Sequence, residues 1–531
     1  MNTTNEPNRD RYYITTSIPY VNSRPHIGHA LEMVQTDTLA RYHRQRGDDS
    51  RFLTGTDDNA LKNVQAAEVE GLSVQELVDR NAEYFRGLRG PLDLSFDDFI
   101  RTSSERRHTE GAQKLWRLCV EAGDVYQKSY EGLYCVGCEQ YYTEGELVNG
   151  LCPEHGVRPE LVEEENYFFR LSRYAGELER LIESGEMRIL PETRLNEVLS
   201  FVRRGLEDFS ISRSQARARG WGVPVPDDSG QVMYVWFDAL ANYITALDYV
   251  TEGELYQRYW VENPNRVHVI GKGILRFHAV YWPAMLLSAG LPTPTAVCVH
   301  EYLTVEGRKI SKSLGNVIDP TAMVDRFGTE ALRYWLLRDM PRTEDADFTF
   351  DRLAIRYNTD LANDLGNLLN RTVSMIVRYR QGVVPQPGEA TDAEREFERI
   401  AAAIPAGVES ALDDFDFRAA LASIWELVLR ANRYVEESAP WTLSKAERGG
   451  DEAAGDRLDT TLYTLAEALR LLSYHLAPFL PSTSERIAAQ LGIAAEAGAP
   501  SEAAAWGGLT PGVRVADPQP IFPRIEVASS V

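Results

Sequence analysis

Two histidines three positions apart are the first residues in this sequence whose types could do chemistry. In SRPHIGHALEM, residues 23–33, His26 and His29 flank Gly28 where a loop gives way to a helical pattern. Imidazoles there can ligate a metal, relay a proton, bind a phosphate or serve local structure alone. A metal site needs a third ligand and favours i, i+4 spacing. Because a helix start attracts anions and Gly28 admits a nucleotide, phosphate binding is favoured over a structural turn or a metal.

A loop with two lysines is the second candidate. VEGRKISKSLGNV, residues 305–317, carries Lys309 and Lys312 among hydroxyl side chains, between Gly307 and Gly315. Such a loop is cationic and can close over polyphosphate. Alone, this pattern is more often a solvated basic loop. Together with PHIGH at the start of a strand–helix pattern, it indicates a nucleotide site.

A cysteine cluster is the third candidate. Cys135 and Cys138 form a CxxC pair, and Cys152 and His155 follow in CPEH. Two closely spaced pairs joined by a short loop are typical of a tetrahedral Cys3His zinc site. Four protein ligands leave no open position, so the predicted zinc is structural, and the alternative is a surface hairpin without metal.

The elements that must position these residues follow a strand–helix rhythm. Residues 11–20, 50–56 and 97–102 read as strands, with helical patterns after His29 and over 73–88. This alternation predicts right-handed βαβ units and a parallel sheet, with PHIGH at the carboxyl edge of a strand, where ligands bind. The rhythm breaks over residues 117–227, which hold the cysteines, and resumes at 266–274 and 295–303.

The C-terminal third reads differently. Beyond about residue 355 strand signals vanish, and residues 357–380, 393–411, 416–437 and 458–476 have helical patterns, which predicts a helix bundle. Residues 444–456 have linker composition, and the stretch from 493 is rich in Ala, Gly and Pro, so we expect it to be loosely ordered.

Bulk properties limit the class of protein. A chain of 531 residues should hold several domains, and it has no apolar run long enough to span a membrane. Its N-terminal residues lack the apolar core of a signal peptide, which favours the cytoplasm. The net charge of −23 argues against non-specific nucleic-acid binding over the whole surface, although a local basic face would suffice for a specific partner.

HIGH and KISKS together resemble the paired signatures of class I aminoacyl-tRNA synthetases, the second of which is normally KMSKS. ITTSIPYVNSRPHIGH, FLTGTDD, the cysteine cluster, YVWFDAL, IGKGILRFHAVYWPAML and GRKISKSLGN, in this order, resemble the methionyl-tRNA synthetase family over about residues 11–490. The valyl, isoleucyl and leucyl enzymes share both signatures, but their large editing insertion would not fit in 531 residues.

The resemblance implies an α/β fold: a Rossmann-like parallel sheet split by a zinc-knuckle connective insertion, followed by an all-α helix-bundle anticodon-binding domain. The expected divisions are the first catalytic half at 1–116, the insertion at 117–227, the second catalytic half at 228–308, the KISKS loop and stem-contact region at 309–356, and the anticodon-binding domain with its tail at 357–531. Some relatives append a dimerisation domain; only a short tail follows the bundle here, so we expect a monomer.

The reaction implied is ATP-dependent activation of L-methionine to methionyl-adenylate, then transfer to the 3′ end of tRNA(Met). The substrate carboxylate attacks the α-phosphate, so catalysis is positioning and charge stabilisation. By resemblance, His26 and His29 hydrogen-bond the ATP phosphates, while Lys309 and Lys312, with Mg²⁺, neutralise the pyrophosphate. The implied ATP-binding residues are Pro25, His26, Gly28, His29, Lys309, Ser311, Lys312 and Ser313.

Methionine offers only a polarizable thioether, so its pocket should be apolar and aromatic. Asp57 matches the acid that holds the substrate ammonium; the other positions carried over are Ile18, Tyr20, Trp236, Ala239, Tyr243, Ile274, Phe277, His278 and Trp282. Taken singly, these aromatic residues would read as core packing. The chain departs from many relatives at Asn59 and Ala60, which replace His and Gly in TGTDEHG, and at Leu240, where some relatives have proline.

The family's helix bundle reads the CAU anticodon. Asn367 and Arg371, at i, i+4 on one helix face, and Pro440 and Trp441, a stacking platform, match its anticodon readers. Without the resemblance they would read as a helix-cap amide, a surface arginine and a buried tryptophan at a turn.

Two rival functions remain from the sequence. One is a class I synthetase for another amino acid, such as valine or cysteine, although cysteine enzymes use an active-site zinc whereas this cluster supplies four ligands of its own. The other is a non-catalytic, zinc-containing RNA-binding paralogue, which would not need both HIGH and KISKS.

Overall fold

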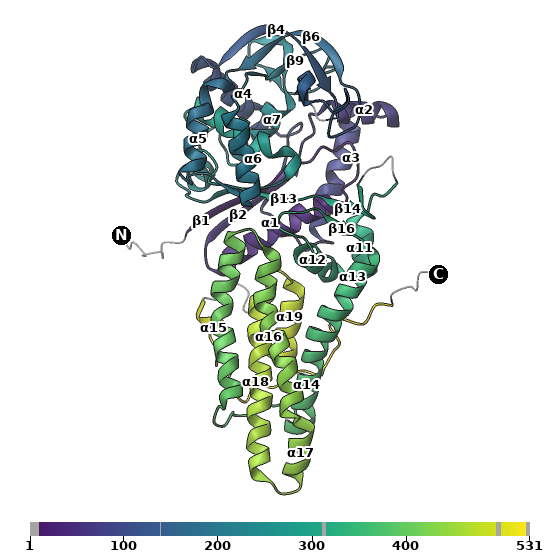
Figure 1. The fold of residues 1–531 in the computed structure, drawn as a ribbon, viewed down its shortest axis with the longest axis vertical. Coiled ribbons are helices and arrows are strands. Elements are labelled where there is room, and N and C mark those ends of the chain that lie inside the picture. The colour runs from purple at the N-terminus through teal and green to yellow at the C-terminus, as the bar shows by residue number, and fades with distance from the viewer. Residues whose placement is uncertain (1–9, 138–139, 311–314, 495–500, 527–531) are drawn as a thin grey trace.

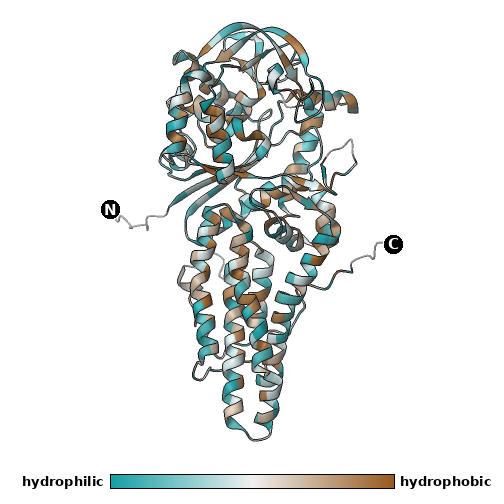
Figure 2. Ribbon diagram, viewed as in Figure 1, coloured by the Kyte–Doolittle hydropathy of each residue, from teal (hydrophilic) through white to brown (hydrophobic). Residues whose placement is uncertain are grey.

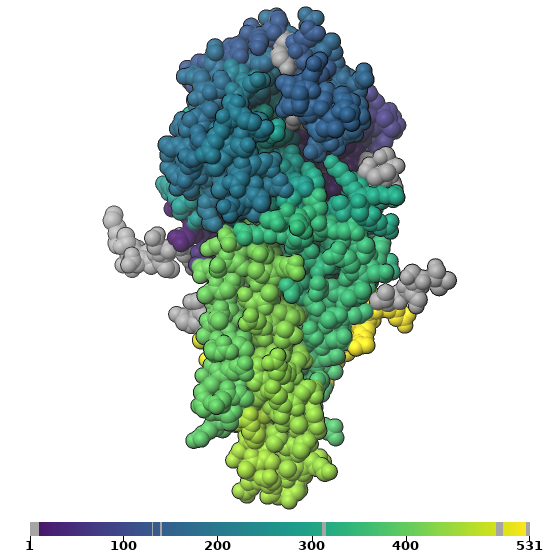
Figure 3. All heavy atoms as spheres, viewed as in Figure 1, coloured from purple at the N-terminus to yellow at the C-terminus, as the bar shows by residue number. Residues whose placement is uncertain are grey.

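The computed structural model describes residues 10–137, 140–310, 315–494 and 501–526. An α/β unit forms one end of the molecule, and a bundle of long helices extends from it (Figures 1 and 3). Among the helices of the described residues, none combines the length and apolar character needed to cross a membrane.

A six-stranded parallel sheet forms the centre of the α/β unit, and its strand order is β3-β2-β1-β12-β13-β7. Its strands are β1 (Arg11–Thr16), β2 (Asp49–Thr56), β3 (Asp98–Arg101), β7 (Arg188–Leu190), β12 (Arg266–Gly271) and β13 (Ala296–His300). Five of the six β1 residues are buried, as expected for a strand covered on both faces. The predicted parallel sheet is therefore confirmed. Strand β7 comes from the stretch in which the strand–helix rhythm was lost.

Helices surround this sheet in the α/β unit. They include α1 (Ile27–Gln45), α2 (Leu61–Glu70), α3 (Val74–Arg86), η1 (Gly87–Arg89), α4 (Arg106–Glu121), η5 (Lys272–Ile274), η6 (Phe277–Tyr281) and α10 (Trp282–Ser288). Of these, α1 and α3 pack directly on its strands. The predicted helix over 73–88 corresponds to α3, which starts where Ser73 and Glu76 form a capping box. The helical segment after β12 is divided, because η6 has the wider π-helical turn before α10 begins.

The connective insertion lies at the opposite end of the molecule from the bundle (Figure 1). Its main sheet is antiparallel in the order β5-β4-β6-β8, and a smaller one has the order β10-β11-β9. The elements are β4 (Val125–Cys135), β5 (Gln140–Tyr142), η2 (Glu144–Glu146), β6 (Glu160–Phe169), η3 (Leu171–Tyr174), α5 (Ala175–Glu183), α6 (Glu192–Arg203), β8 (Phe209–Ser210), β9 (Ser212–Ser214), β10 (Pro224–Val225) and β11 (Asp228–Met233).

The chain returns to the α/β unit and then reaches the bundle through a small sheet. The returning elements are α7 (Val235–Leu240), α8 (Asn242–Thr245), α9 (Glu254–Tyr256) and η4 (Gln257–Val261). The small sheet has the order β15-β14-β16. It comprises β14 (Leu303–Val305), β15 (Arg308–Lys309) and β16 (Ala346–Phe348), with α11 (Pro320–Phe327), α12 (Thr329–Arg338) and α13 (Phe350–Arg356) beside it.

The predicted helix bundle is confirmed. It contains η8 (Tyr357–Gly366), α14 (Asn367–Arg380), α15 (Asp392–Asp413), α16 (Phe417–Ser438), α17 (Pro440–Arg448), α18 (Glu452–Leu476) and α19 (Pro481–Leu491). Apolar residues alternate with polar ones along these helices, as amphipathic helices require (Figure 2). The expected linker at 444–456 is mostly helical, because α17 and α18 meet there in a short turn.

The C-terminal stretch, expected to be loosely ordered, instead packs on the bundle over residues 501–526, beginning with η9 (Ser501–Ala504). Leu509, Val515 and Phe522 are buried. The buried carboxylate of Glu467 accepts hydrogen bonds from three backbone N–H groups at 2.7–3.1 Å, those of residues 507–509. These long-range contacts order a segment whose composition alone predicts flexibility.

Candidate functional site

The HIGH turn caps the first helix with its own two histidines. The Gly28 N–H donates to His26 Nδ1 at 3.1 Å, and the His26 N–H donates to His29 Nδ1 at 3.0 Å. Burial lowers the pKa of His26 to about 4, and burial together with nearby His26 and His300 lowers the pKa of His29 well below its ordinary value. Both rings are therefore neutral at pH 7, and because each Nδ1 accepts a hydrogen bond, each proton resides on Nε2.

Gly28 is required by the shape of this cap. The two imidazole rings are stacked with centroids 3.8 Å apart. A Cβ at residue 28 would lie 2.9 Å from His26 Cε1, closer than real Cβ contacts allow. The immediate reason for glycine is thus the folded-over ring of His26, whatever access it also provides to a nucleotide.

This turn lies at the carboxyl edge of the parallel sheet, at its topological switch point. Strand β1 pairs with β2 on one side and with β12 on the other, and all three strands are parallel. Residues that follow these three strands are consequently brought to one edge, where open α/β sheets bind ligands. Ile18 and Tyr20 follow β1, Asp57 follows β2, and Ile274 follows β12.

Most residues expected to bind methionine meet at that edge. Tyr20 and Asp57 form an isolated parallel bridge, and the rings of Tyr20 and Trp236 are 6.3 Å apart. Trp236 stacks on Phe277 with centroids 3.9 Å apart and planes 6° apart. Trp236 stays half-buried, whereas Asp57 and Phe277 are buried. Aromatic side chains thus gather beside the buried carboxylate of Asp57.

His278 and Tyr243 form the polar pair of this site. His278 Nδ1 lies 2.9 Å from the carbonyl oxygen of Ile274, so Nδ1 donates to it. Nε2 then accepts, and the Tyr243 hydroxyl donates to it at 2.7 Å. Burial lowers the pKa of His278 to about 4 and raises that of Tyr243, so both groups are neutral at pH 7.

The remaining pocket candidates lie at different depths. Ile18 and Ile274 are half-buried, and Ala239 is buried on α7. Trp282 is fully buried, and its indole N–H donates to His268 Nε2 at 3.2 Å. Sequence reasoning missed His268, whose ring packs 4.1 Å from that of Tyr243; a histidine inside the apolar strand RVHVIG was the available signal.

A chain of hydrogen bonds connects Asp57 to Asp238 and His108 through Asn59. The Asn59 N–H donates to Asp57 Oδ1 at 3.1 Å, and the Asn59 amide donates to Asp238 Oδ2 at 2.6 Å. The other oxygen of Asp238 lies 2.6 Å from His108 Nε2. Sequence reasoning left Asn59 without a role and missed Asp238 and His108. The geometry ties the departure at Asn59 directly to the carboxylate expected to bind the substrate ammonium.

The lysine loop starts beside the cysteine cluster. Lys309, on β15, is exposed, and its Nζ lies 3.2 Å from the carboxylate of Glu154, between Cys152 and His155 in the sequence. Beyond the loop, the Ile318 carbonyl oxygen accepts a hydrogen bond of 3.0 Å from the Ile27 N–H, in the HIGH turn. The segment that follows the lysine loop therefore lies against the turn that carries His26 and His29. Ser311, Lys312 and Ser313 lie outside the described residues.

Three of the four expected zinc ligands meet in the insertion. The sulfur atoms of Cys135 and Cys152 and a ring nitrogen of His155 all lie within 4.8 Å of one another. Cys138 lies outside the described residues. A Cβ at Gly137 would lie 2.7 Å from the ring of His155, so glycine there allows the two halves of the knuckle to close. Two thiols and an imidazole at this separation fit a zinc ion.

The residues expected to read an anticodon lie on helices of the bundle. Asn367 begins α14 and is exposed, and Arg371, one turn later, is 2.7 Å from the Glu436 carboxylate near the end of α16. Pro440 and Trp441 begin α17, at the far end of the bundle from the sheet (Figure 1). Trp441 is 45% exposed, which is inconsistent with the buried tryptophan considered as an alternative.

The fold and the edge site define a class I aminoacyl-tRNA synthetase. Residues 12–158 and 146–373 match the family model "tRNA synthetases class I (M)", and residues 384–530 match "Anticodon binding domain of methionyl tRNA ligase". The chain is 45% identical to the methionine–tRNA ligase of Caldanaerobacter subterraneus, over 97% of this chain and 79% of that protein. It is 44% identical to that of Brucella suis, over 97% and 98%. The chain therefore belongs to the methionyl-tRNA synthetase family.

Solved structures agree with this assignment. Mycobacterium tuberculosis methionyl-tRNA synthetase in complex with methionyl-adenylate superposes with a TM-score of 0.92 at 42% identity, over 97% of this chain and 100% of that one. The apo form gives 0.85 at 40% identity, over 98% and 99%. The resemblance inferred from the signature motifs is confirmed, and the rival functions are not favoured.

Proposed function

We propose that this chain activates L-methionine with ATP and transfers the methionyl group to the 3′ end of tRNA(Met). One observation carries the proposal: the aromatic site around Asp57 and the two neutral histidines lie at the same sheet edge. The apolar site suits a thioether, and Asp57 suits the substrate ammonium. Relatives named methionine–tRNA ligase support the same reaction.

In the first step the methionine carboxylate attacks the α-phosphate of ATP. An oxygen–phosphorus bond forms, the bond to pyrophosphate breaks, and no side chain has to act as nucleophile. His26 and His29 donate hydrogen bonds from Nε2 to phosphate oxygens, and being neutral they need not lose a proton first. Lys309 and Lys312 neutralise the departing pyrophosphate, which is electrostatic stabilisation at the point where charge develops.

In the second step the terminal ribose hydroxyl of tRNA attacks the methionyl carbonyl carbon. The bond between that carbon and the phosphate oxygen breaks, and AMP leaves with the bonding electrons while its phosphate takes up the hydroxyl proton. Asp57 pairs with the ammonium group of the methionyl moiety and holds that moiety in position. The Tyr243–His278 pair and the stacked Trp236 and Phe277 enclose the side chain and exclude water. Positioning of this kind can supply much of the rate acceleration for a reaction between bound groups.

Two metals belong to the proposal. Cys135, Cys138, Cys152 and His155 would hold one structural Zn²⁺, which would stiffen the knuckle that carries Glu154. Mg²⁺ would accompany ATP and share the charge of the phosphates. The close approach of the described sulfur and nitrogen atoms supports the first assignment. Metal analysis of the purified protein should find about one zinc per chain, with no zinc after alanine replaces both Cys135 and Cys152.

The bundle would read the CAU anticodon through Asn367, Arg371, Pro440 and Trp441. The exposed indole of Trp441 offers a stacking surface for an unpaired base. Arg371 is already oriented by Glu436, so less of its side-chain freedom is lost when it contacts RNA.

The decisive experiment is ATP–pyrophosphate exchange across a panel of amino acids. Methionine alone should stimulate exchange. Dependence on another amino acid would replace the assignment, and absence of exchange with every amino acid would favour the non-catalytic paralogue.

The chain is proposed to act as a cytoplasmic monomer. The most exposed large apolar residues of the described part lie on separate elements or loops, as is normal for a surface without a large interface: Val69, Val148, Leu161, Ile355 and Leu429. Light scattering of the purified protein and fractionation of cells test these two points.

A further inference from the structure

Tyr302 lies between the lysine loop and η5, which leads into the methionine site. It stands between β13 and β14 in the chain and is half-buried. Lys272 Nζ lies 4.8 Å and Lys309 Nζ 5.4 Å from the centre of its ring. Ammonium groups at these distances are attracted to the face of an aromatic ring. One ring therefore contacts a lysine of η5 and the first lysine of the KISKS signature.

The hydroxyl of Tyr302 is seated against Gly273. A Cβ at residue 273 would lie 1.9 Å from the hydroxyl oxygen, so glycine leaves the room that the hydroxyl occupies. Burial raises the pKa of Tyr302, and a hydrogen bond from the Gly273 backbone opposes that rise. The carbonyl oxygen of the next residue, Ile274, accepts the 2.9 Å hydrogen bond of His278 Nδ1. The hydroxyl end of the ring thus touches the segment that orients the polar pair of the methionine site.

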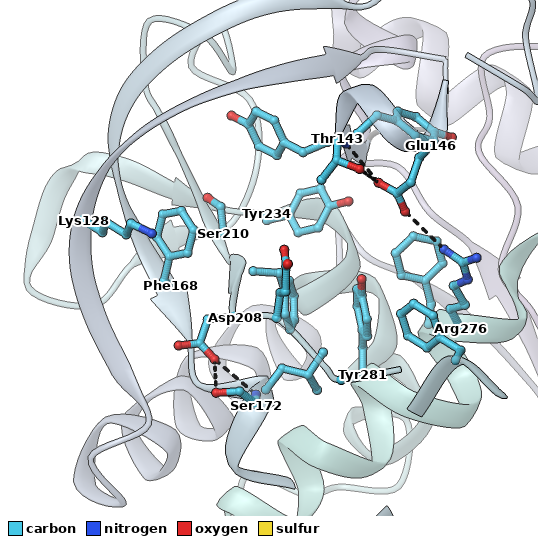
Figure 4. A pocket seen from close by; sticks show the side chains of 18 of the residues that line it. Lys128, Thr143, Glu146, Phe168, Ser172, Asp208, Ser210, Tyr234, Arg276 and Tyr281 are labelled. Carbon is cyan, nitrogen blue, oxygen red and sulfur yellow. Dashed lines mark hydrogen bonds and ion pairs between the residues drawn. The ribbon is translucent and has the colours of Figure 1, made fainter. Parts of the chain in front are cut away.

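The connective insertion holds the continuation of the same segment. Arg276, shortly after Gly273, lines a cavity of about 720 Å³ between the insertion and η6, and its guanidinium lies 3.7 Å from the Glu146 carboxylate (Figure 4). The guanidinium also lies 4.4 Å from the centre of the Phe201 ring on α6. The short stretch from Gly273 to Arg276 is therefore contacted by the insertion at one end and by Tyr302 at the other.

The carboxylate of Asp345 fixes Lys272 beside this ring, whereas Lys309 is held more weakly. One oxygen of Asp345 lies 2.5 Å from Lys272 Nζ and accepts a 2.9 Å hydrogen bond from the Tyr302 N–H. Lys309 is exposed, and so is Glu154, whose carboxylate lies 3.2 Å from its Nζ. Because exposed ion pairs contribute little, Lys309 is the partner of the ring that can exchange its carboxylate for a phosphate.

We infer that Tyr302 is a positioning residue that couples the methionine site to the lysine loop. Methionine packed against His278 steadies the backbone of residues 273–274 and with it the Tyr302 hydroxyl, and the ring then keeps Lys309 beside the phosphates. Because coupling between two binding sites is reciprocal, ATP in turn strengthens methionine binding. The inference rests on the proposed function, which assigns methionine and the phosphates to these two sites.

Two variants separate the two ends of the tyrosine. Tyr302→Phe removes the hydroxyl and keeps the ring, whereas Tyr302→Leu removes both. Tyr357→Phe is the matched control, because the Tyr357 hydroxyl also bonds to backbone, donating to the Pro523 carbonyl oxygen at 2.8 Å. The control thus makes the same chemical change in the helix bundle, where Tyr357 begins η8.

The quantity to measure is the dissociation constant of radiolabelled methionine, by equilibrium dialysis with and without adenosine 5′-(α,β-methylene)triphosphate and Mg²⁺. This analogue cannot be cleaved between its α- and β-phosphorus atoms. In the wild type and in Tyr357→Phe it should tighten methionine binding by about tenfold. The tightening should fall to about threefold in Tyr302→Phe and nearly vanish in Tyr302→Leu. A merely structural role would weaken methionine binding equally with and without the analogue, so that the ratio would not change.

A second test approaches the contact from the glycine. Gly273→Ala places a Cβ where the hydroxyl lies and should lower methionine-dependent exchange by about tenfold or more. In the double variant with Tyr302→Phe, the nearest ring atom, Cζ, lies 3.2 Å from that Cβ. The double variant should therefore be more active than Gly273→Ala alone, since the two changes share one contact.

The same tightening in both Tyr302 variants as in the wild type would overturn the inference, as would a wild type in which the analogue has no effect. Equal loss of tightening in Tyr357→Phe would overturn it too, because any lost hydroxyl would then have this effect. Additive losses in the double variant would show that the hydroxyl does not act through Gly273. Absence of methionine-dependent exchange in the wild type would refute the proposed function, whereas normal exchange with an unchanged ratio would refute the role of Tyr302 alone.

Discussion

Asp37 on α1 and Arg333 on α12 form an ion pair of 2.9 Å in which both side chains are fully buried. Arg333 also donates to the Leu92 carbonyl in the α/β unit and to the Phe479 carbonyl beyond α18, both at 3.0 Å. Burial alone would raise the pKa of Asp37, but Arg333 and Arg41 outweigh it and hold the pKa below its ordinary value. One arginine therefore connects the catalytic sheet to the helix bundle.

Replacing Arg333 with Met should destabilise the protein strongly. The substitution leaves Arg41 as the one cation paired with the buried Asp37 carboxylate, which also accepts hydrogen bonds from Ser95, and breaking a buried pair typically costs about 3–5 kcal/mol. Thermal unfolding followed by calorimetry should show a clear drop in the unfolding temperature. The double variant with Asp37→Asn should recover part of the loss, and equal stability of the single variant and wild type would contradict this account.

Substituting Asn59 should affect methionine more than ATP. Asn59→Ala removes the amide that donates to Asp238, and Asp57 loses its link to that carboxylate. We expect the KM for methionine in exchange to rise by about tenfold, with the KM for ATP within about twofold, since one charge-linked hydrogen bond is lost. Asn59→His, which restores a donor and the residue of many relatives, should retain more activity than Asn59→Ala. Equal changes in both KM values would argue against a positioning role.

Removing Glu154 should help the lysine loop to bind ATP. Glu154→Gln takes away the carboxylate 3.2 Å from Lys309 Nζ, which competes with phosphate for the same cation. Because the pair is exposed, the gain should be small, and we expect the KM for ATP to fall by at most about fivefold. Glu144→Gln removes the same charge from another exposed position of the insertion and should have no effect. A higher KM for ATP in Glu154→Gln would mean that the pair positions Lys309 productively.

Trp441→Ala should impair charging without affecting activation. The exposed indole contributes stacking rather than core packing, so its loss should lower kcat/KM for tRNA by roughly tenfold or more. Methionine-dependent exchange should stay near wild type because the catalytic sheet is distant. Measuring both activities on one preparation separates loss of anticodon reading from misfolding, which would reduce them together.

Acidification should destabilise the bundle through His475. Burial, with a smaller contribution from Arg470, lowers the pKa of this histidine from 6.5 to about 4. Between these two pKa values the unfolded chain binds a proton at His475 and the folded chain does not. The free energy of unfolding is therefore unaffected by this group above pH 6.5 and decreases as the pH falls below it. At pH 5 this amounts to about 2 kcal/mol. His475→Gln should lose less thermal stability than wild type between pH 7 and pH 5; parallel curves would exclude this histidine as a cause.

Some features were determined by the sequence alone because they depend on neighbours along the chain. Apolar periodicity predicted the parallel strands and the helices, and the motifs HIGH and KISKS, with the cysteine cluster and the other segments in their order, resembled those of the family. These signals are local, since strand and helix patterns repeat every few residues and a ligand pair must lie on one tight turn.

Contacts between distant segments were decided only by the tertiary structure. The sequence gives no periodic signal that Lys309 meets Glu154, that Asn59 reaches Asp238, or that β7 joins the main sheet. The tautomers of His26 and His29 follow from hydrogen bonds that form only once the loop closes on the helix. Composition predicted a loose C-terminal tail, yet Glu467 binds its backbone. Such contacts depend on packing and burial of the whole chain, which strengthen polar interactions that no local propensity encodes.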